Sequence, residues 1–270
     1  MKRFIVYLFV IVSLFVFSAC SKKEANIVVA GSTSVQPYMD ILAEEFMISH
    51  SEYEVYVQGG GSSAGITAAE SQTANLGMSS RELHDSELQL WSIEIAKDGL
   101  VLVINSKNSI NDLTSQEIRD IYSAKITNWK EVGGIDAKIH IITREEGSGT
   151  RSAFESLVMG DVEITAKAIV QDSNGAVRQL VGDDPYAIGF ISLGLVDNTL
   201  KVVDLDGIKA TRENVINGTY PLYRPFLLVS KYEPTGEAKD FIDFILSKEG
   251  QDILLKEGLI SYHMEDKNEE

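Results

Sequence analysis

The chain has 270 residues, of which 40 are Asp or Glu, 24 are Lys or Arg and one is Cys, and its formal net charge is −16. This acidic balance argues against a nucleic-acid partner, because nucleic-acid binding depends on basic surface. The single cysteine excludes an internal disulfide framework and a cysteine-based metal cage. A chain of this length can bury a core of its own, either as one large domain or as two lobes.

The first twenty residues have the pattern of a lipoprotein leader. Lys2 and Arg3 precede the apolar run Phe4–Phe17, which is shorter than the roughly 20 residues of a membrane span and typical of a signal-peptide core. Ser18-Ala19-Cys20 resembles the lipobox of bacterial lipoproteins, although Phe17 stands where that motif usually has leucine. We therefore expect a signal peptide at residues 1–19, lipidation of Cys20 and a tether at residues 20–25. Plain secretion with an incidental cysteine is the alternative.

Two early strands each end in a polar turn that opens a helix. Asn26–Ala30 is strand-like and leads to Gly31-Ser32-Thr33-Ser34-Val35, after which apolar residues recur at helical spacing. Tyr53–Val57 alternates as a half-exposed strand does, and Gly59–Gly65 follows it before a helix that starts near Ile66. Glycine lets the backbone approach a ligand closely, and a helix N-terminus carries partial positive charge. We expect both turns to contact a ligand; ordinary N-capping and a flexible linker are the alternatives.

Two later strands end in the same way. Asn75–Met78 is followed by Ser79-Ser80-Arg81-Glu82, where a simple cap and a surface ion pair are the alternatives. Lys138–Ile142 leads to Thr143-Arg144-Glu145-Glu146-Gly147-Ser148-Gly149-Thr150-Arg151 and then to a helical pattern. This last turn combines hydroxyl donors, free helix N–H groups and a forked guanidinium. It predicts a site for a small oxyanion, unless it is only a helix cap beside a surface arginine.

The order of these elements predicts the fold class. Strands that alternate with helices indicate βαβ units, and therefore an α/β fold with mostly parallel sheets. In such sheets ligands lie at the carboxyl ends of the strands, close to helix N-termini, and all four turns fall there. Candidate crossings near Asn105 and at Pro221–Pro225 divide the chain into a first lobe, residues 26–104 plus 226–270, and a second lobe, residues 105–225.

A tetrahedral oxyanion needs hydrogen-bond donors that converge from several directions, and the four turns supply them. Arg144 is the one positive charge that we expect at the ion, whereas Arg151 lies one residue further into the helix and is expected to point away. The expected donors are the hydroxyls of Thr33, Ser34, Ser62, Ser80, Ser148 and Thr150, the N–H of Gly149 and the guanidinium of Arg144.

These motifs, in their order and spacing, resemble the PstS family, the phosphate-binding subunits of bacterial ABC-type phosphate importers. The resemblance covers nearly all of the mature chain, and its main carriers are the turns Gly31–Val35, Gly59–Gly65, Gly77–Leu83 and Arg144–Arg151. It implies a two-lobe fold like that of type II periplasmic binding proteins. In that fold the sheets are mixed but mostly parallel, helices cover both faces, two strands cross between the lobes and phosphate is clamped between them.

The resemblance also implies roles for individual residues and partners. Matched position by position, it assigns Thr33, Ser34, Ser62, Ser80, Arg144, Ser148, Gly149 and Thr150 to phosphate. Ser32, Ser63, Arg81 and Glu146 are expected to support the site, with Glu146 as the acidic partner that holds Arg144. We expect an extracytoplasmic monomer, lipid-anchored to the cell membrane, that serves the permease and ATPase subunits of an importer and needs no metal ion or cofactor.

One position departs from the family pattern. Better-studied members carry an aspartate where this chain has Ser80. An aspartate accepts a hydrogen bond from the proton of phosphate and repels sulfate, which has no proton to donate. Serine lacks that repulsive charge. We therefore expect weaker discrimination against sulfate, unless another group takes over this role.

Two other function classes are alternatives to phosphate binding. An enzyme such as a phosphatase is disfavoured, because the four histidines lie outside the four turns, and no HExxH motif or P-loop lysine occurs. Another tetrahedral oxyanion, such as sulfate, molybdate or tungstate, is the remaining alternative as ligand.

Overall fold

The computed structural model describes residues 25–261. The expected leader, the lipidation site Cys20 and all but the last residue of the expected tether lie outside this range. Within it, no helix is both long and apolar enough to cross a membrane.

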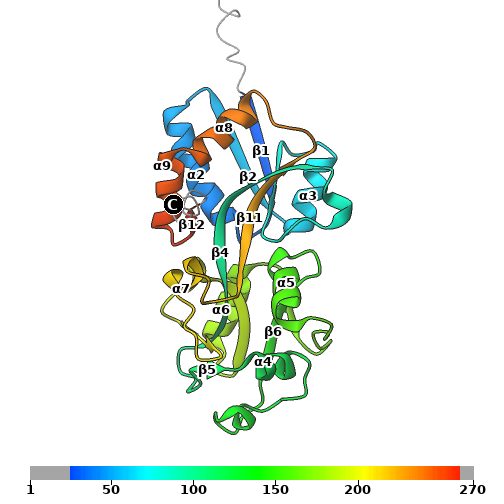
Figure 1. Ribbon diagram of the computed structural model, residues 1–270, viewed down its shortest axis with the longest axis vertical. Coiled ribbons are helices and arrows are strands. Elements are labelled where there is room, and N and C mark those ends of the chain that lie inside the picture. The colour runs from blue at the N-terminus through cyan, green and yellow to red at the C-terminus, as the bar shows by residue number, and fades with distance from the viewer. Residues whose placement is uncertain (1–24, 262–270) are drawn as a thin grey trace, which may run out of the picture.

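Figure 1 shows two lobes, one above the other, through which a single mixed sheet runs. Among the described residues the sheet has ten strands, eight of them in the order β2-β1-β3-β11-β4-β8-β6-β7, with β9 and β12 both paired to β4. The strands are β1 (Ala25–Gly31), β2 (Tyr53–Gly59), β3 (Leu76–Ser79), β4 (Trp91–Asn105), β6 (His140–Arg144), β7 (Ile169–Gln171), β8 (Ala187–Ser192), β9 (Leu200–Val202), β11 (Tyr223–Ser230) and β12 (Ile260–Ser261), with β5 (Asp112–Leu113) and β10 (Asp204–Leu205) as a separate pair.

Helices surround both parts of the sheet. The helices of lobe 1, the upper lobe in Figure 1, are α2 (Gln36–Ser49), α3 (Ser62–Glu70), α8 (Glu237–Leu246) and α9 (Lys248–Lys256). Those of lobe 2 are α4 (Ser115–Tyr122), α5 (Gly149–Phe154), α6 (Asn174–Asp183) and α7 (Arg212–Ile216), and a π-helical segment, Glu155–Met159, continues α5. Short 3₁₀ helices occupy Asp85–Glu87, Trp129–Val132 and Leu193–Leu195.

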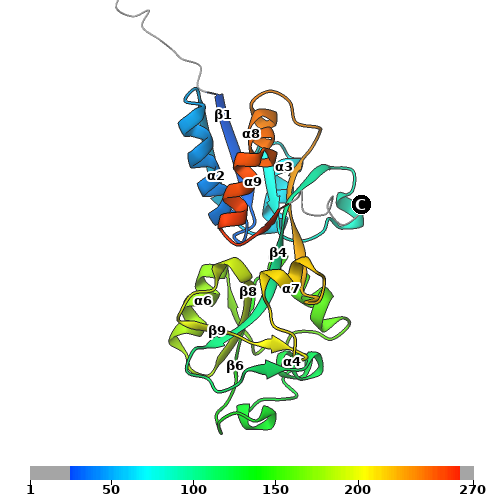
Figure 2. The same ribbon diagram turned by 60° about the vertical axis from the view of Figure 1, so that its left-hand side comes forward.

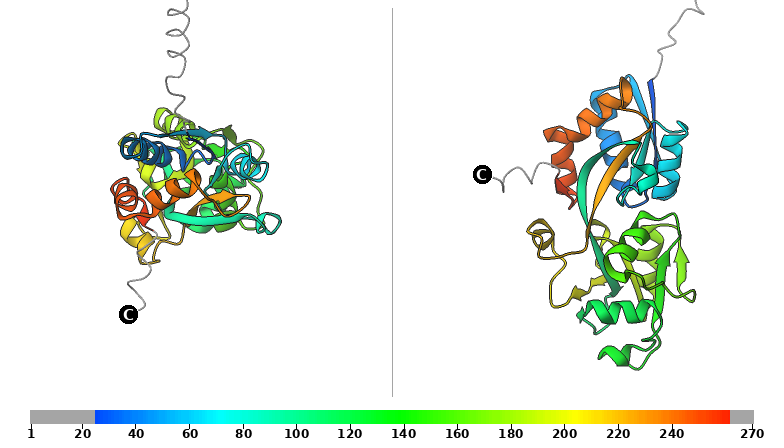
Figure 3. Two further views of the ribbon diagram at one scale, coloured as in Figure 1. Left: turned by 90° about the horizontal axis from the view of Figure 1, so that it is seen from above. Right: turned by 45° about the vertical axis from the view of Figure 1, so that its right-hand side comes forward.

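Alternating side chains along β11 place a core on each face of the sheet in lobe 1. Phe226 and Leu228 pack in the core formed with α2, α8 and α9, whereas Leu227 and Val229 pack with Ile66 of α3. This is the two-residue period expected of a strand that is buried on both faces. Figure 3 shows α3 on the opposite side of the strands from α2, α8 and α9. The expected α/β class with helices on both faces is therefore confirmed.

The strands β4 and β11 run between the lobes side by side (Figures 2 and 3). β4 is one continuous strand of 15 residues. Trp91–Gly99 pair antiparallel with β11, and Leu100–Ile104 pair antiparallel with β8. In contrast, β1 is parallel to β2 and β3, and β6 is parallel to β7 and β8. The parallel pairings therefore belong to the individual lobes, whereas β4, which runs between the lobes, is antiparallel to all four strands with which it pairs, β8, β9, β11 and β12.

Gly31, at the end of β1, allows the chain to turn into the first polar segment. Its φ is +140°, and a Cβ atom built on it would lie 2.3 Å from the carbonyl oxygen of Met78. Because Met78 belongs to the neighbouring strand β3, its backbone cannot give way without disturbing the sheet. Gly31 therefore fixes how closely the turns after β1 and β3 approach each other.

We expect Gly31→Ala to reduce stability more than Gly133→Ala. Gly133 also has a positive φ, +85°, but a Cβ there would meet nothing within 4 Å. Gly133→Ala is the control and should lower the free energy of unfolding by about 1 kcal/mol, because alanine is strained in a left-handed conformation. Gly31→Ala should lower it by about 1–3 kcal/mol more, because the added Cβ overpacks against β3. Urea unfolding of the two variants measures both free energies, and equal losses would contradict the close approach described here.

Candidate functional site

Hydroxyl groups from distant parts of the chain meet between the lobes. Ser34 Oγ lies 2.8 Å from Thr150 Oγ1, so a side chain that follows β1 contacts a side chain of α5. Ser32 Oγ donates a hydrogen bond of 2.8 Å to Ser80 Oγ, and Ser62 Oγ lies 3.4 Å from Ser80 Oγ. The structure thus brings together residues from all four polar turns.

These polar groups are almost completely buried. Ser34, Ser62, Ser80, Arg144, Ser148 and Thr150 are each no more than 1% exposed, whereas Thr33 is half-buried. Burying so many polar atoms is unfavourable unless each finds a hydrogen-bond partner. Such a cluster is therefore poorly explained by stability alone.

Gly149 lets the two lobes come close at this point. A Cβ atom at Gly149 would lie 2.2 Å from Ser62 Oγ and 2.7 Å from Ser80 Oγ. Ser148, the N-cap of α5, accepts a hydrogen bond from the backbone N–H of Arg151 at 3.2 Å. The first N–H groups of a helix have no partner within that helix, so those of Gly149 and Thr150 are donors at the same place.

Arg144, at the end of β6, is 1% exposed and extensively bonded. Its Nε and Nη2 atoms donate to the two carboxylate oxygens of Glu145, at 2.9 and 2.8 Å, and Nη2 also donates to Thr33 Oγ1 at 3.2 Å. Further hydrogen bonds of 3.2 Å reach the carbonyl oxygens of Gln171 and Asp172. Nη1 is buried, and within residues 25–261 it has no partner.

The acidic partner of Arg144 is Glu145, so the assignment of this role to Glu146 was wrong. A tight turn explains the difference: the N–H of Ser148 bonds to the carbonyl oxygen of Glu145 and places Glu146 at the exposed tip. Arg151 behaves as expected, because its side chain bonds to Glu155 and to the carbonyl oxygen of Arg144.

A second guanidinium, that of Arg224, reaches the site, and the expectation of a single positive charge there was wrong. The register of β4 and β11 places Arg224 directly opposite Asp98. Its Nη2 and Nε atoms donate to Asp98 Oδ2 at 3.0 and 3.2 Å, and Nη2 also donates to Ser34 Oγ at 3.1 Å. Sequence reasoning missed Arg224 because no motif marks it; its position in an otherwise apolar strand was the available signal.

The ion pair of Asp98 and Arg224 is fully enclosed, since both side chains are 2% exposed or less. Burial raises the pKa of Asp98, while the charge of Arg224 and a 2.6 Å hydrogen bond from Ser192 oppose that rise. Burial likewise lowers the pKa of Arg224, and Asp98 opposes that change. Each group is therefore tolerated in the interior because the other is present.

Asn174, the first residue of α6, was also missed. It is 0% exposed, and its Nδ2 lies 2.7 Å from Ser34 Oγ and 3.5 Å from Thr150 Oγ1. Its Oδ1 atom is buried and, in the described part of the chain, unpartnered. The signal was present in the sequence, because Asp172-Ser173-Asn174-Gly175 follows a strand and opens a helix as the four selected turns do.

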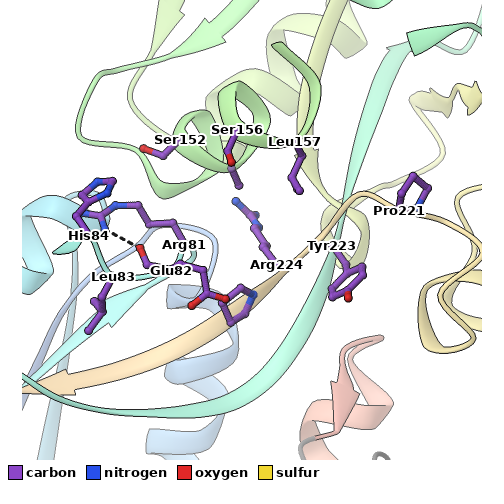
Figure 4. Close-up of a pocket in the computed structure, with 12 residues that line it drawn as sticks. Arg81, Glu82, Leu83, His84, Ser152, Ser156, Leu157, Pro221, Tyr223 and Arg224 are labelled. Atoms are coloured by element: carbon purple, nitrogen blue, oxygen red, sulfur yellow. Dashed lines mark hydrogen bonds between the residues drawn. The ribbon is translucent and has the colours of Figure 1, made fainter. Parts of the chain in front are cut away.

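The expected supporting residues lie at the edge of this cluster. The Nη atoms of Arg81 bond to both carboxylate oxygens of Glu87, at 2.7 and 2.9 Å, and one of them lies 3.4 Å from Ser63 Oγ. The N–H of Ser63 donates to the carbonyl oxygen of Gly147, which is a direct link between the lobes. A neighbouring pocket of about 380 Å³ is lined by Arg81, Ser156 and Arg224 among others. In Figure 4 the Arg224 side chain points toward the helical segment that carries Ser156.

The acidic side chains of the cluster are paired with arginines. Both arginines at its centre are paired with a carboxylate, Glu145 and Asp98, which keeps the local charge balanced. Within residues 25–261 no group of three or more His, Cys, Asp or Glu side chains could hold a metal ion. The hydroxyls and guanidinium groups of the cluster can donate hydrogen bonds to a ligand.

Two α/β lobes joined by a pair of crossing strands, with polar turns converging between them, define the class of solute-binding proteins. Residues 18–249 match the family model described as a PBP superfamily domain. The phosphate-binding protein PstS of Bacillus subtilis is 31% identical over 235 residues, which cover 85% of this chain and 78% of that protein. The chain therefore belongs to the PstS family.

Two solved structures are similar along nearly their whole length. A putative phosphate ABC transporter substrate-binding protein from Clostridium perfringens, with bound phosphate, has a TM-score of 0.85 at 45% identity. An ABC-type phosphate transport receptor from Vibrio cholerae has a TM-score of 0.73 at 40% identity. In each case the match covers 87% of this chain and 99% of the other.

We expect Asp98→Ala to lower the free energy of unfolding by about 3–5 kcal/mol, because it leaves the charge of Arg224 buried and unpaired. A double variant, Asp98→Leu with Arg224→Met, removes both charges and should recover much of this loss. Urea unfolding measures both effects. A double variant less stable than Asp98→Ala would show that the charges themselves are not the cause.

Proposed function

We propose that this protein captures inorganic phosphate between its lobes and delivers it to the permease of an ABC importer. The observation that carries the proposal is the convergence of buried hydroxyl donors with the unpartnered Nη1 of Arg144. It is supported by relatives: the Bacillus subtilis protein is named for phosphate binding, and the Clostridium perfringens structure contains phosphate. The family is a substrate-binding component of a transporter and not an enzyme.

In this proposal, phosphate is held by donors from both lobes. Lobe 1 supplies the hydroxyls of Thr33, Ser34, Ser62 and Ser80, and lobe 2 supplies Arg144, Ser148, Gly149 and Thr150. Neutral hydrogen bonds contribute about 0.5–1.5 kcal/mol each, and charged ones about 1.5–3 kcal/mol. A set of this size supports a binding free energy of about −8 kcal/mol or better, which corresponds to a micromolar or tighter Kd.

The supporting residues position these donors. The hydrogen bond from Ser32 orients the hydroxyl of Ser80, and Ser63 links the turn before α3 to the turn after β6. Arg81, fixed by Glu87, holds Ser63. Glu145, in place of Glu146, aligns the guanidinium of Arg144.

The proposal includes the setting in which the protein works. It acts outside the cytoplasm as a monomer, anchored to the membrane by a lipid on Cys20, with the permease and ATPase subunits of the importer as partners. The two lobes close on the ion by a hinge motion at the crossing strands. Along β4 the pairing strand changes from β11 to β8 at Leu100. This change supports a boundary between lobe 1 and lobe 2 slightly before residue 104.

We expect Arg144→Ala to raise the Kd for phosphate by about tenfold to a hundredfold, because a buried charge-assisted donor is lost. Arg151→Ala is the matched control, since the side chain of Arg151 bonds to Glu155 and to the carbonyl oxygen of Arg144, and only its backbone N–H, which the substitution keeps, bonds to Ser148 Oγ. Calorimetric titration of ligand-stripped protein measures both. Equal losses in the two variants would mean that the wrong arginine has been assigned.

Lobe closure should be visible in solution. The expected ligand residues come from both lobes, so bound phosphate should favour the closed arrangement and reduce the radius of gyration. Small-angle scattering of stripped protein with and without phosphate measures this change. Identical dimensions in the two states would argue against closure.

A further inference from the structure

The hydrogen bonds between the lobes fix the direction of the proton on Ser34. Ser34 Oγ accepts from Nη2 of Arg224 at 3.1 Å and from Nδ2 of Asn174 at 2.7 Å. A hydroxyl oxygen has two lone pairs, and both are then engaged. Ser34 must therefore donate its own proton, either to Thr150 Oγ1 or to a bound ligand.

Ser80 Oγ already accepts one hydrogen bond from within lobe 1. Ser32 Oγ accepts from the N–H of Ser34 and donates its proton to Ser80 Oγ. The backbone N–H of Ser80 donates to Ser62 Oγ. One lone pair of Ser80 Oγ is therefore occupied by Ser32, and its other lone pair and its proton are left for Ser62 Oγ, 3.4 Å away, and for a ligand. Ser80 is thus poorly placed to supply the acceptor that an aspartate would supply at this position.

The carboxylates near the cluster are already engaged. Glu145 accepts from Nε and Nη2 of Arg144 with both oxygens. Asp98 accepts from Arg224 with one oxygen and from Ser192 with the other. Neither acid contacts a candidate ligand hydroxyl directly. Neither therefore takes over the acceptor role that an aspartate at position 80 would have.

Asn174 carries a buried acceptor that no donor of the described chain engages. Its Nδ2 lies against Ser34 Oγ and Thr150 Oγ1, and its Oδ1, on the same amide carbon, is buried with no partner in the described chain. Thr143 Oγ1 is also unpartnered, but Thr143 precedes Arg144 on β6, and neighbouring strand residues face opposite sides of a sheet. A buried amide oxygen without a donor is unfavourable, and a ligand that brings a proton removes the cost.

We propose that Asn174 is a specificity-determining residue whose Oδ1 accepts a hydrogen bond from the protonated oxygen of a tetrahedral oxyanion. The inference rests on the proposed function and deepens it, because it names the ligand class as protonated oxyanions. Phosphate and arsenate retain a proton near neutral pH, whereas sulfate and selenate do not. An unprotonated ion would face Oδ1 with lone pairs only, and the site rejects it for that reason.

The test is calorimetric titration of ligand-stripped protein with phosphate, arsenate, sulfate and selenate. At a pH above the second pKa of phosphate, phosphate and sulfate carry the same charge and differ by one proton, so charge alone does not separate them. Wild type should bind phosphate and arsenate more tightly than sulfate and selenate. In Asn174→Ala the phosphate-to-sulfate affinity ratio should fall by about tenfold or more, with phosphate and arsenate weakened and sulfate and selenate not.

Two further variants separate an acceptor role from a structural one. Asn174→Asp keeps an acceptor, whichever way the amide of Asn174 is turned, and should retain the preference for protonated ions. Ser148→Ala removes a donor and should weaken all four ions in similar proportion. If Asn174→Ala weakens all four ions equally, or if Asn174→Asp loses the preference, the inference is wrong.

The outcomes for wild type separate this inference from the function on which it rests. If wild type binds sulfate as tightly as phosphate, the acceptor role is wrong while the oxyanion site stands. If wild type binds none of the four ions, the proposed function itself is wrong.

Discussion

The ion pair between Asp98 and Arg224 connects the architecture to the candidate site. It lies between the two strands that cross from lobe to lobe, and Arg224 continues from it to Ser34. Because both charges are buried, the pair holds β4 and β11 in a single register. The donor set around Ser34 therefore depends on the same contact that aligns the lobes.

Local neutrality explains how a strongly acidic protein can offer a site to an anion. Glu145 and Asp98 each balance one buried arginine, and the hydroxyls of both lobes supply uncharged donors around them. Helix N-termini act within about one turn, and distant surface charge is screened beyond about 8–10 Å. The net charge of −16 is thus compatible with anion capture.

Local sequence predicted the fold class and the meeting of the four turns, because each turn combines a strand end, glycines or hydroxyls and a helix start within a few residues. The contacts that local sequence did not predict depend mostly on which residues far apart in the chain lie next to each other in the fold. Arg224 reaches Ser34 through strand register, across 190 positions of the chain. Asn174 matters because α6 of lobe 2 packs against a turn of lobe 1. The choice of Glu145 over Glu146 follows from the turn closed by Ser148, which spacing alone does not reveal.

The central claim is that the polar cluster between the lobes is a phosphate site. Titrating ligand-stripped wild-type protein with inorganic phosphate in a calorimeter tests it most directly. One phosphate should bind per chain with a micromolar or tighter Kd, about −8 kcal/mol or better. Absence of saturable phosphate binding by correctly folded, stripped protein would contradict the claim.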